Sequence, residues 1–168
     1  KRVSLFQSSP SYLTVFFFLL LSVFIAFGSA LNNEFLSWDD ASFVSANRMI
    51  QSFDSERLFQ MATSFHTGNW YPITWFSHAL DYRLFGSNPA GHHLTSILWH
   101  GVNIFLVFVL FQRLLSLAKV DFYSADLFWA GIAAALLFGL HPLRVESVVW
   151  VSQRKDLLCA FFVLAGYL

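Results

Sequence analysis

The chain has 168 residues, of which 57% are hydrophobic and only 12% are charged. Soluble domains carry about 25% charged residues, so this composition excludes a water-soluble globular protein and predicts an integral membrane protein. Ten basic residues balance ten acidic ones, and a formal net charge of zero gives no indication of nucleic-acid binding.

The first apolar stretch covers residues 12–31 and contains no charged residue. At ~1.5 Å rise per residue, a helix of this length crosses a ~30 Å hydrocarbon core. Lys1 and Arg2 precede it, and because basic flanks favour the cytoplasmic side we expect a cytoplasmic N-terminus. A cleaved signal peptide is the alternative, since Gly28-Ser29-Ala30 places small residues at the end of the run.

Residues 32–91 are too polar to span a membrane, and we expect them to form an extracytoplasmic loop. Apolar residues recur at helical spacing within 41–53 and 56–65, which predicts two short amphipathic helices on the membrane interface. Ser55 is the expected cap of the second. Helical spacing returns over 75–85, after a stretch rich in turn formers.

Residues 92–117 are the second expected span. His93, Ser96, His100 and Asn103 step by three and four residues, so they share one helix face, and a polar stripe in a lipid-embedded helix should point into protein. The short loop after it holds Arg113 and Lys119 beside Asp121 and Asp126, and its basic residues are consistent with the cytoplasm.

The third expected span, 127–140, is short and ends at His141-Pro142, because proline cannot continue a helix without losing a backbone hydrogen bond. Residues 143–152 then alternate polar and apolar in the manner of an amphipathic outside turn or helix. A fourth apolar run, 156–168, is shorter than the about 20 residues of a full span. We therefore expect a truncated span and a chain that is a fragment of a longer, multi-pass membrane protein.

Asp39 and Asp40 form an acidic pair just beyond the first span. Adjacent carboxylates there are costly to desolvate unless something pairs or uses them, so one hypothesis makes one of them a general base. The alternative is a helix N-cap with a solvated neighbour, because an aspartate before Ala-Ser-Phe-Val is a good cap.

Three basic residues, Arg144, Arg154 and Lys155, fall in the expected second outside loop, against the positive-inside rule. Guanidinium groups pair well with phosphate oxygens, which suggests a phosphate-binding site. Contact with anionic lipid headgroups explains the same residues equally well.

The histidines do not show the usual spacing of metal ligands, so we expect no metal and no cofactor. Phosphate-binding glycine loops, serine elbows and zinc knuckles are absent from the sequence as well. Soluble nucleotide chemistry is therefore disfavoured, and a transferase with a membrane-embedded donor fits better.

An ordered set of short motifs carries a family resemblance. They are Trp38-Asp39-Asp40, the stretch 69–74, Asp81-Tyr82-Arg83-Leu84-Phe85-Gly86, Asn88-Pro89 with His92-His93-Leu94, His100 with Asn103, the stretch 141–148, and Arg154-Lys155-Asp156. Together they resemble the transmembrane and tetratricopeptide-repeat O-mannosyltransferases and their bacterial relatives, in the GT-C superfamily of glycosyltransferases. The tetratricopeptide repeats themselves are absent from this chain.

The resemblance implies an all-α, GT-C-like multi-span helical bundle with amphipathic helices in the first extracytoplasmic loop. It implies a polyprenyl-phosphate sugar donor, a protein acceptor, and a location in the bacterial inner membrane or the endoplasmic reticulum. The residues that it carries over are Asp39 and Asp40 as the catalytic pair and, as substrate-binding candidates, His93, His141, Arg144, Glu146, Arg154 and Asp156.

The expected reaction is an inverting transfer of a sugar, typically mannose, to a protein serine or threonine. Asp39 would take the proton of the hydroxyl, and Arg154 would stabilise the departing lipid phosphate. We expect this fragment alone to be inactive. The alternative is a non-catalytic membrane scaffold or a transporter module. In a scaffold the acidic pair would cap a helix at the surface with no cavity beside it, whereas a transporter should place its charged groups near the bilayer midplane.

Overall fold

The computed structural model describes residues 10–118 and 124–168. Within them the chain is all-α and contains no strand. The expectations that rest on Lys1, Arg2, Lys119 and Asp121 lie outside the described residues.

The helices follow one another along the chain as α1 (Tyr12–Phe27), α2 (Ser55–Thr63), α3 (Pro72–Phe85), α4 (Pro89–Leu117), α5 (Ser124–Gly139), α6 (Arg144–Val149) and α7 (Arg154–Gly166). Short single turns connect them: the 3-10 turns η1 (Gly28–Asn32), η3 (Arg48–Ile50), η4 (His66–Gly68) and η5 (Val151–Gln153), and the π turn η2 (Ala41–Ser45).

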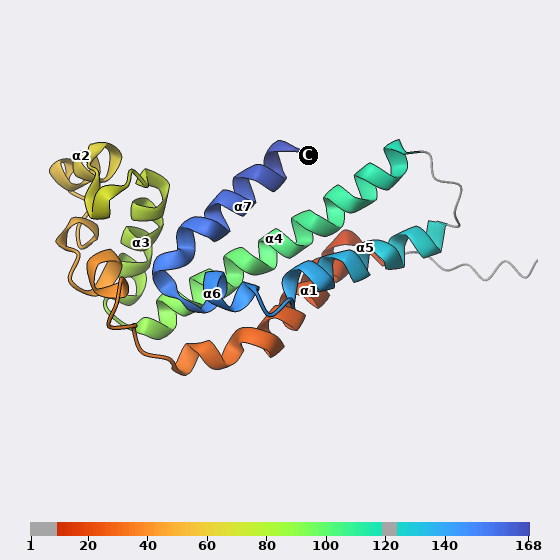
Figure 1. Cartoon of the computed structure of the whole chain (residues 1–168), viewed down its shortest axis with the longest axis horizontal. Helices are drawn as coiled ribbons and strands as arrows, with labels where there is room; N and C mark the ends of the chain where they lie inside the picture. Colours follow the sequence, from red (N-terminus) through yellow and green to blue (C-terminus); the bar gives the residue numbers. More distant parts are fainter. Residues whose placement is uncertain (1–9, 119–123) are drawn as a thin grey trace, which may run out of the picture.

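Helix α4 is the centre of the molecule and contacts α1, α3, α5, α6 and α7 (Figure 1). Asn88 caps its N-terminus by accepting from the Ala90 amide, and Pro89 occupies the first turn, where its missing N–H is not needed. At Gly91 an added Cβ would collide with the Phe85 ring, so this glycine lets α3 and α4 approach closely.

Two apolar clusters hold the fold together. The larger one joins α1, α4 and α5 through Leu19, Val23, Ile104, Phe108 and neighbours. The smaller one lies in the end lobe, which we define as residues 33–86, around Trp75 and Met61. The end lobe sits at one end of the long helices (Figure 1).

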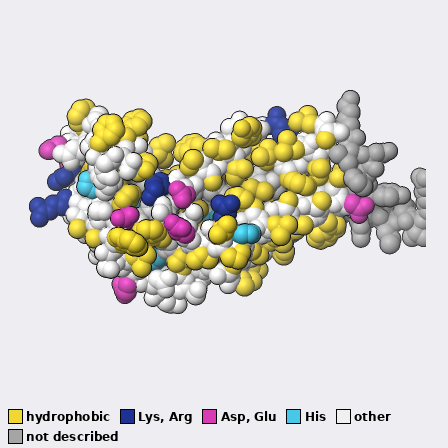
Figure 2. Space-filling model, in the orientation of Figure 1, with side chains coloured by type: hydrophobic (Ala, Val, Ile, Leu, Met, Phe, Trp, Pro, Cys, Tyr) yellow, Lys and Arg dark blue, Asp and Glu magenta, His cyan; other side chains and the backbone are white. Residues whose placement is uncertain are grey.

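The outer face of α1 exposes large apolar side chains: Leu13, Phe17, Leu21 and Ile25 are each at least 57% exposed. Two segments, Tyr12–Asn32 and Pro89–Leu117, are long and apolar enough to cross a bilayer. In Figure 2 the face over the long helices is mainly hydrophobic, whereas charged side chains gather toward the end lobe. An exposed apolar belt of this kind is stable in lipid and not in water, so the chain is a membrane protein.

Several predicted elements differ from the observed ones at their ends. The second span begins at Pro89 rather than 92, and the third apolar helix, α5, ends at Gly139, just before His141-Pro142. The first expected amphipathic helix, 41–53, is two single turns, η2 and η3. The cap of α2 is Asp54, whose carboxylate accepts from the Arg57 amide, and not Ser55.

Candidate functional site

Asp40 of the acidic pair contacts the turn before α7 at Ser152, 112 residues further along the chain. Asp40 is 1% exposed, and its two carboxylate oxygens accept from the amides of Ser152 (2.9 Å) and Leu36 (2.9 Å). Beside it, the indoles of Trp38 and Trp150 stack with centroids 6.0 Å apart. Asp40 thus joins two parts of the chain: the segment after η1, which contains Leu36, and the turn η5, which contains Ser152.

Asp39 is in a different environment from its neighbour. Its side chain is half-buried, and its carboxylate accepts no hydrogen bond from the other described residues. Its backbone carbonyl accepts from the Phe43 amide and the Ser42 hydroxyl, which fixes the turn that presents the carboxylate. Within the described part of the chain, the Asp39 carboxylate has no hydrogen-bond partner, whereas both oxygens of Asp40 have one.

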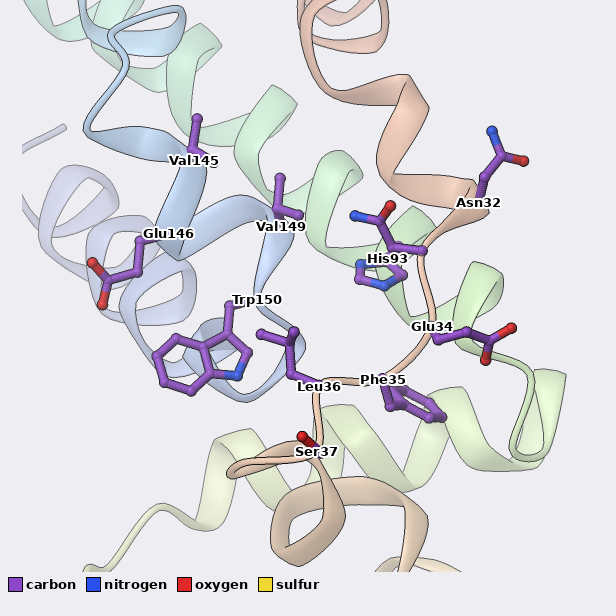
Figure 3. A pocket seen from close by; sticks show the side chains of 11 residues that line it. Asn32, Glu34, Phe35, Leu36, Ser37, His93, Val145, Glu146, Val149 and Trp150 are labelled. Atoms are coloured by element: carbon purple, nitrogen blue, oxygen red, sulfur yellow. The ribbon is translucent and has the colours of Figure 1, made fainter.

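A cavity of about 770 Å³ opens between these segments. Residues 32–37 form one wall, Val145, Glu146, Val149 and Trp150 form the other, and His93 of α4 lies between them (Figure 3). His93 is 2% exposed, and neither of its ring nitrogens has a hydrogen-bond partner among the described residues. A buried imidazole without a partner is costly unless a ligand or water meets it, so His93 is poised to contact an occupant of the cavity.

Arg154 is fully buried and faces away from this cavity, into the contact between α3 and α4. Its guanidinium binds the Asp81 carboxylate at 2.6 Å, the Ser77 and Ser96 hydroxyls at 3.0 and 3.1 Å, and the His92 carbonyl at 2.7 Å. Four of its five N–H groups are thereby used. This environment fits a residue that fixes the start of α7 better than one that receives a substrate phosphate.

The other predicted residues lie on α6 and the first turn of α7. His141 accepts from the Leu143 amide through Nδ1 and so helps to start α6. Arg144 is half-buried, with its guanidinium 4.4 Å from the centroid of the Phe138 ring. Asp156 is exposed and accepts from the Ser147 hydroxyl at 3.2 Å, which joins α6 to α7. Of the predicted site residues, Glu146 and His93 line the cavity, whereas Asp39 and Asp40 do not.

Lys155 was singled out in the sequence only as part of a basic group, and the structure gives it a distinct position. Its ammonium lies 5.2 Å from the Phe43 ring centroid and donates to the Ser152 carbonyl. It also borders a second hollow of about 530 Å³ between the start of α3 and α7, whose lining includes Tyr71, Ile73, Leu158 and Phe162. A partly exposed cation at the rim of an apolar groove suits an amphiphilic anion.

Three buried polar residues lie next to Arg154. His78 and Asp81 of α3 and His92 of α4 are buried, and the atoms that they could offer to a metal lie within 4.8 Å of one another. Burial, and then the Arg154 guanidinium, hold the pKa of the His78 imidazole well below its usual range, so His78 is neutral at pH 7. His78 and Asp81 are three residues apart on one helix face, a spacing that could have been noticed in the sequence.

The polar stripe of α4 points into the protein as predicted. Ser96 accepts from Arg154, the His100 ring donates to the Gly139 carbonyl at 2.8 Å, and Asn103 donates to the Leu157 carbonyl at 2.8 Å. The stripe therefore fastens α4 to the end of α5 and to α7, which keeps the walls of the cavity in place.

Comparison with characterised proteins identifies relatives of one kind. The chain is 27% identical to the protein O-mannosyl-transferase F38B6.6 of Caenorhabditis elegans over 84% of this chain and 21% of that protein. It is 36% identical to human protein O-mannosyl-transferase TMTC4 over 58% of this chain and 14% of the relative, and 32% identical to Tmtc1 of Drosophila melanogaster over 60% and 11%.

The chain thus spans about a fifth or less of the length of these three relatives. No family model matches the chain, and no solved structure does. Over the region that it shares with them, the chain is similar to these protein O-mannosyl-transferases, two of which are named as TMTC proteins.

Proposed function

We propose that the chain forms part of the active site of a polyprenyl-phosphate-sugar-dependent glycosyltransferase with a GT-C-like, multi-pass fold. The reaction is the inverting transfer of mannose to a serine or threonine of a protein. The observation that carries the proposal is the junction of the acidic segment with the turn before α7, beside a cavity large enough for a sugar and a peptide side chain. The printed names of the relatives support the sugar and the protein acceptor.

Asp39 is the general base in this proposal. Its carboxylate has no partner among residues 10–118 and 124–168, whereas both oxygens of Asp40 accept from backbone amides. Asp39 removes the proton of the acceptor hydroxyl as the oxygen attacks the anomeric carbon, and a positioned base of this kind contributes roughly 10²–10⁴-fold to the rate. Asp40 acts by holding the turn that carries Asp39 against η5.

His93 and Glu146 contact the substrates in the cavity. The unpartnered nitrogens of His93 can donate to or accept from a sugar hydroxyl, and Glu146 on the opposite wall can accept from one. His141 and Asp156 keep α6 in place, through the Leu143 amide and the Ser147 hydroxyl respectively. In this arrangement they support the wall that carries Glu146.

The departing lipid phosphate is stabilised by Lys155 and Arg144, and Arg154 fixes the turn on which Lys155 stands. This assignment follows the burial of the three side chains, since Arg154 is 0% exposed while the other two are partly exposed. The apolar groove beside Lys155 then accommodates the first isoprene units of the donor. The end lobe faces the extracytoplasmic side, where such donors present their sugars.

A cavity whose wall ends at Ser37, two residues before Asp39, supports this proposal over a non-catalytic scaffold. The test uses the complete open reading frame that contains this sequence, purified in detergent. It is incubated with labelled polyprenyl-phosphate mannose, and with the glucose and galactose donors, in the presence of peptides rich in serine and threonine. Label on the peptide from the mannose donor, released by an α-mannosidase, is expected; no label from any donor would contradict the proposal.

A further inference from the structure

A third hollow lies in the end lobe, apart from the cavity and from the groove beside Lys155. It has a volume of about 460 Å³ and is formed by the turns η2 and η3 and by one face of α2. Its lining includes Arg48, Arg57 and His66, and none of the described residues that line it is acidic. The whole end lobe carries six acidic residues and three arginines, so two of those three arginines gather at this hollow, which we call the basic pocket.

Neighbouring hydrogen bonds order both arginines of the basic pocket. Arg57 donates through Nη1 to the side-chain oxygen of Gln60 at 3.2 Å. Asn47 is 4% exposed and accepts from the Met49 amide at 3.0 Å, which caps the turn η3 on which Arg48 stands. Because the chain is already ordered at both positions, less conformational entropy is lost when the two guanidinium groups bind a ligand.

Neither guanidinium is neutralised by a carboxylate of the described residues, where every ion pair involves Asp81. Asp54, close to Arg57 in the chain, uses its carboxylate oxygens on the Ser52 hydroxyl and the Arg57 amide. Arg57 uses one of its five N–H groups within the described part of the chain, and Arg48 uses none. The remaining donors are available to an anion, and a guanidinium binds a carboxylate through two parallel hydrogen bonds.

The basic pocket shares a turn with the proposed base. Ser42 lines the pocket and donates through its hydroxyl to the Asp39 carbonyl at 2.9 Å. The Ser42 carbonyl accepts from Nε2 of His66 at 3.0 Å, which attaches this turn to another part of the pocket lining. The segment between Ser37, where the wall of the cavity ends, and Ser42, where the lining of the pocket begins, contains Asp39. An anion in the pocket is therefore close to an acceptor hydroxyl at Asp39.

The surroundings of the basic pocket favour a carboxylate of the acceptor over a lipid phosphate. Phe59 is 69% exposed and lies two residues beyond Arg57, so the two side chains point about 160° apart around α2. A membrane in contact with Phe59 would lie on the far side of α2 from the pocket. The acidic residues of the end lobe outnumber its arginines, so the lobe does not attract polyanions from a distance, and binding relies on local pairing with a single carboxylate.

We propose that the basic pocket selects acceptor segments that carry an acidic side chain close to the serine or threonine. Arg48 and Arg57 bind the carboxylate of an aspartate or glutamate and thereby position the hydroxyl at Asp39. An extended peptide advances about 3.3 Å per residue, so the acidic residue stands about two to four positions before or after the acceptor residue. This inference rests on the proposed function, because it names the class of acceptor for that same site.

The first test measures peptide binding without any donor and so does not depend on the transfer reaction. The protein of the complete open reading frame, purified in detergent, is titrated with fluorescein-labelled peptides that contain one threonine and a single glutamate about two to four positions away, or glutamine in its place. We expect the best glutamate peptide to bind about threefold to tenfold more tightly than its glutamine counterpart, since charge-assisted hydrogen bonds at an open site are partly screened.

Variants assign this preference to the basic pocket. Arg48→Gln and Arg57→Gln should each remove most of it, whereas Arg83→Gln, at an exposed arginine of the same lobe outside the pocket, should keep it. The double variant Arg48→Glu, Arg57→Glu should instead prefer peptides with lysine in place of glutamate, a gain that an unfolded protein would not show. In the transfer assay, the two glutamine variants should raise KM for the glutamate peptide and leave kcat, and KM for the glutamine peptide, unchanged.

The failure of this inference can be told apart from the failure of the proposed function. Equal affinity of the wild type for all glutamate and glutamine peptides, or no preference for lysine in the double variant, would overturn the inference even where transfer is observed. Binding of phosphatidylglycerol micelles that needs Arg48 and Arg57, without discrimination between the peptides, would also overturn it. No transfer from any donor, with the preference for glutamate retained, would contradict the proposed function and support acidic-peptide binding.

Discussion

The two halves of α4 are buried in different ways. The half next to the end lobe buries His92, His93 and Ser96, and Arg154 reaches it from α7. The other half buries Ile104 and Phe108 among the apolar residues of α1 and α5. Lipid gives no hydrophobic driving force between helices, so the apolar half depends on packing, whereas the polar half depends on hydrogen bonds that must all be present at once.

This contrast explains where a functional site can form. Apolar packing against lipid tolerates gradual change, but a buried guanidinium needs each of its partners, and a site built on it is held in one geometry. The cavity and the acidic segment lie at the polar end of α4, where this network fixes the turn before α7.

The largest effect on stability is expected from Arg154→Met. The variant leaves the Asp81 carboxylate buried without its cation, and breaking such a pair costs about 3–5 kcal/mol. Thermal unfolding in detergent measures the loss. Arg48→Met, at an exposed arginine of the end lobe, is the matched control. An equal drop of the unfolding temperature in both variants would contradict a stabilising role for the Arg154 network.

Leu19→Ala tests the apolar half. Leu19 is 0% exposed between α1 and α4, so the cavity left behind should cost about 2–5 kcal/mol. Leu21, two residues further on, is 59% exposed on the outer face of α1, and Leu21→Ala should change stability by about 0.5 kcal/mol or less. Similar losses at both positions would contradict the assignment of the outer face to lipid.

Asp40→Asn should have a smaller effect, because an amide keeps one oxygen but turns an N–H toward the Ser152 or Leu36 amide. One unsatisfied buried group costs about 1–3 kcal/mol. The stack of Trp38 on Trp150 should loosen at the same time, which tryptophan fluorescence can follow. Ser42→Ala removes a hydroxyl from the same turn without touching η5 and should leave the fluorescence unchanged.

The smallest effect concerns the cap of α2. The Ser52 hydroxyl, and then the Arg57 amide, lower the pKa of the Asp54 carboxyl. The ionised cap therefore stabilises the end lobe at pH values above the usual aspartate pKa. This contribution is lost as the pH falls through the lowered pKa. Asp54→Ala should therefore lower the unfolding midpoint slightly at pH 7, and the difference from the wild type should vanish in acid; a difference independent of pH would contradict the capping role.

Local patterns predicted the parts of this fold that depend on local chemistry. The polar stripe of α4, the two long apolar segments and the end of α5 before Pro142 all followed from spacing and backbone geometry. The cap at Asp54 was missed because Ser55 is an equally good capping residue and the choice depends on where the chain turns.

Contacts between distant segments could not be predicted in the same way. Arg154 pairs with Asp81, 73 residues earlier, and no local spacing indicates that partner. The different environments of Asp39 and Asp40 likewise depend on the hydrogen bond from the Ser152 amide to Asp40, a contact that the sequence does not indicate. The catalytic and substrate-binding roles of these residues stay predictions.

The most direct test of the proposed function is the rate of mannosyl transfer by Asp39→Asn, measured in the complete protein together with binding of the polyprenyl-phosphate donor. We expect a loss of roughly 10²–10⁴-fold in transfer with the donor Kd unchanged, because asparagine keeps the size of the side chain and cannot accept the proton. Asp126→Asn, at an exposed acid of α5, is the control that should keep full activity. Wild-type transfer by Asp39→Asn would contradict the proposal.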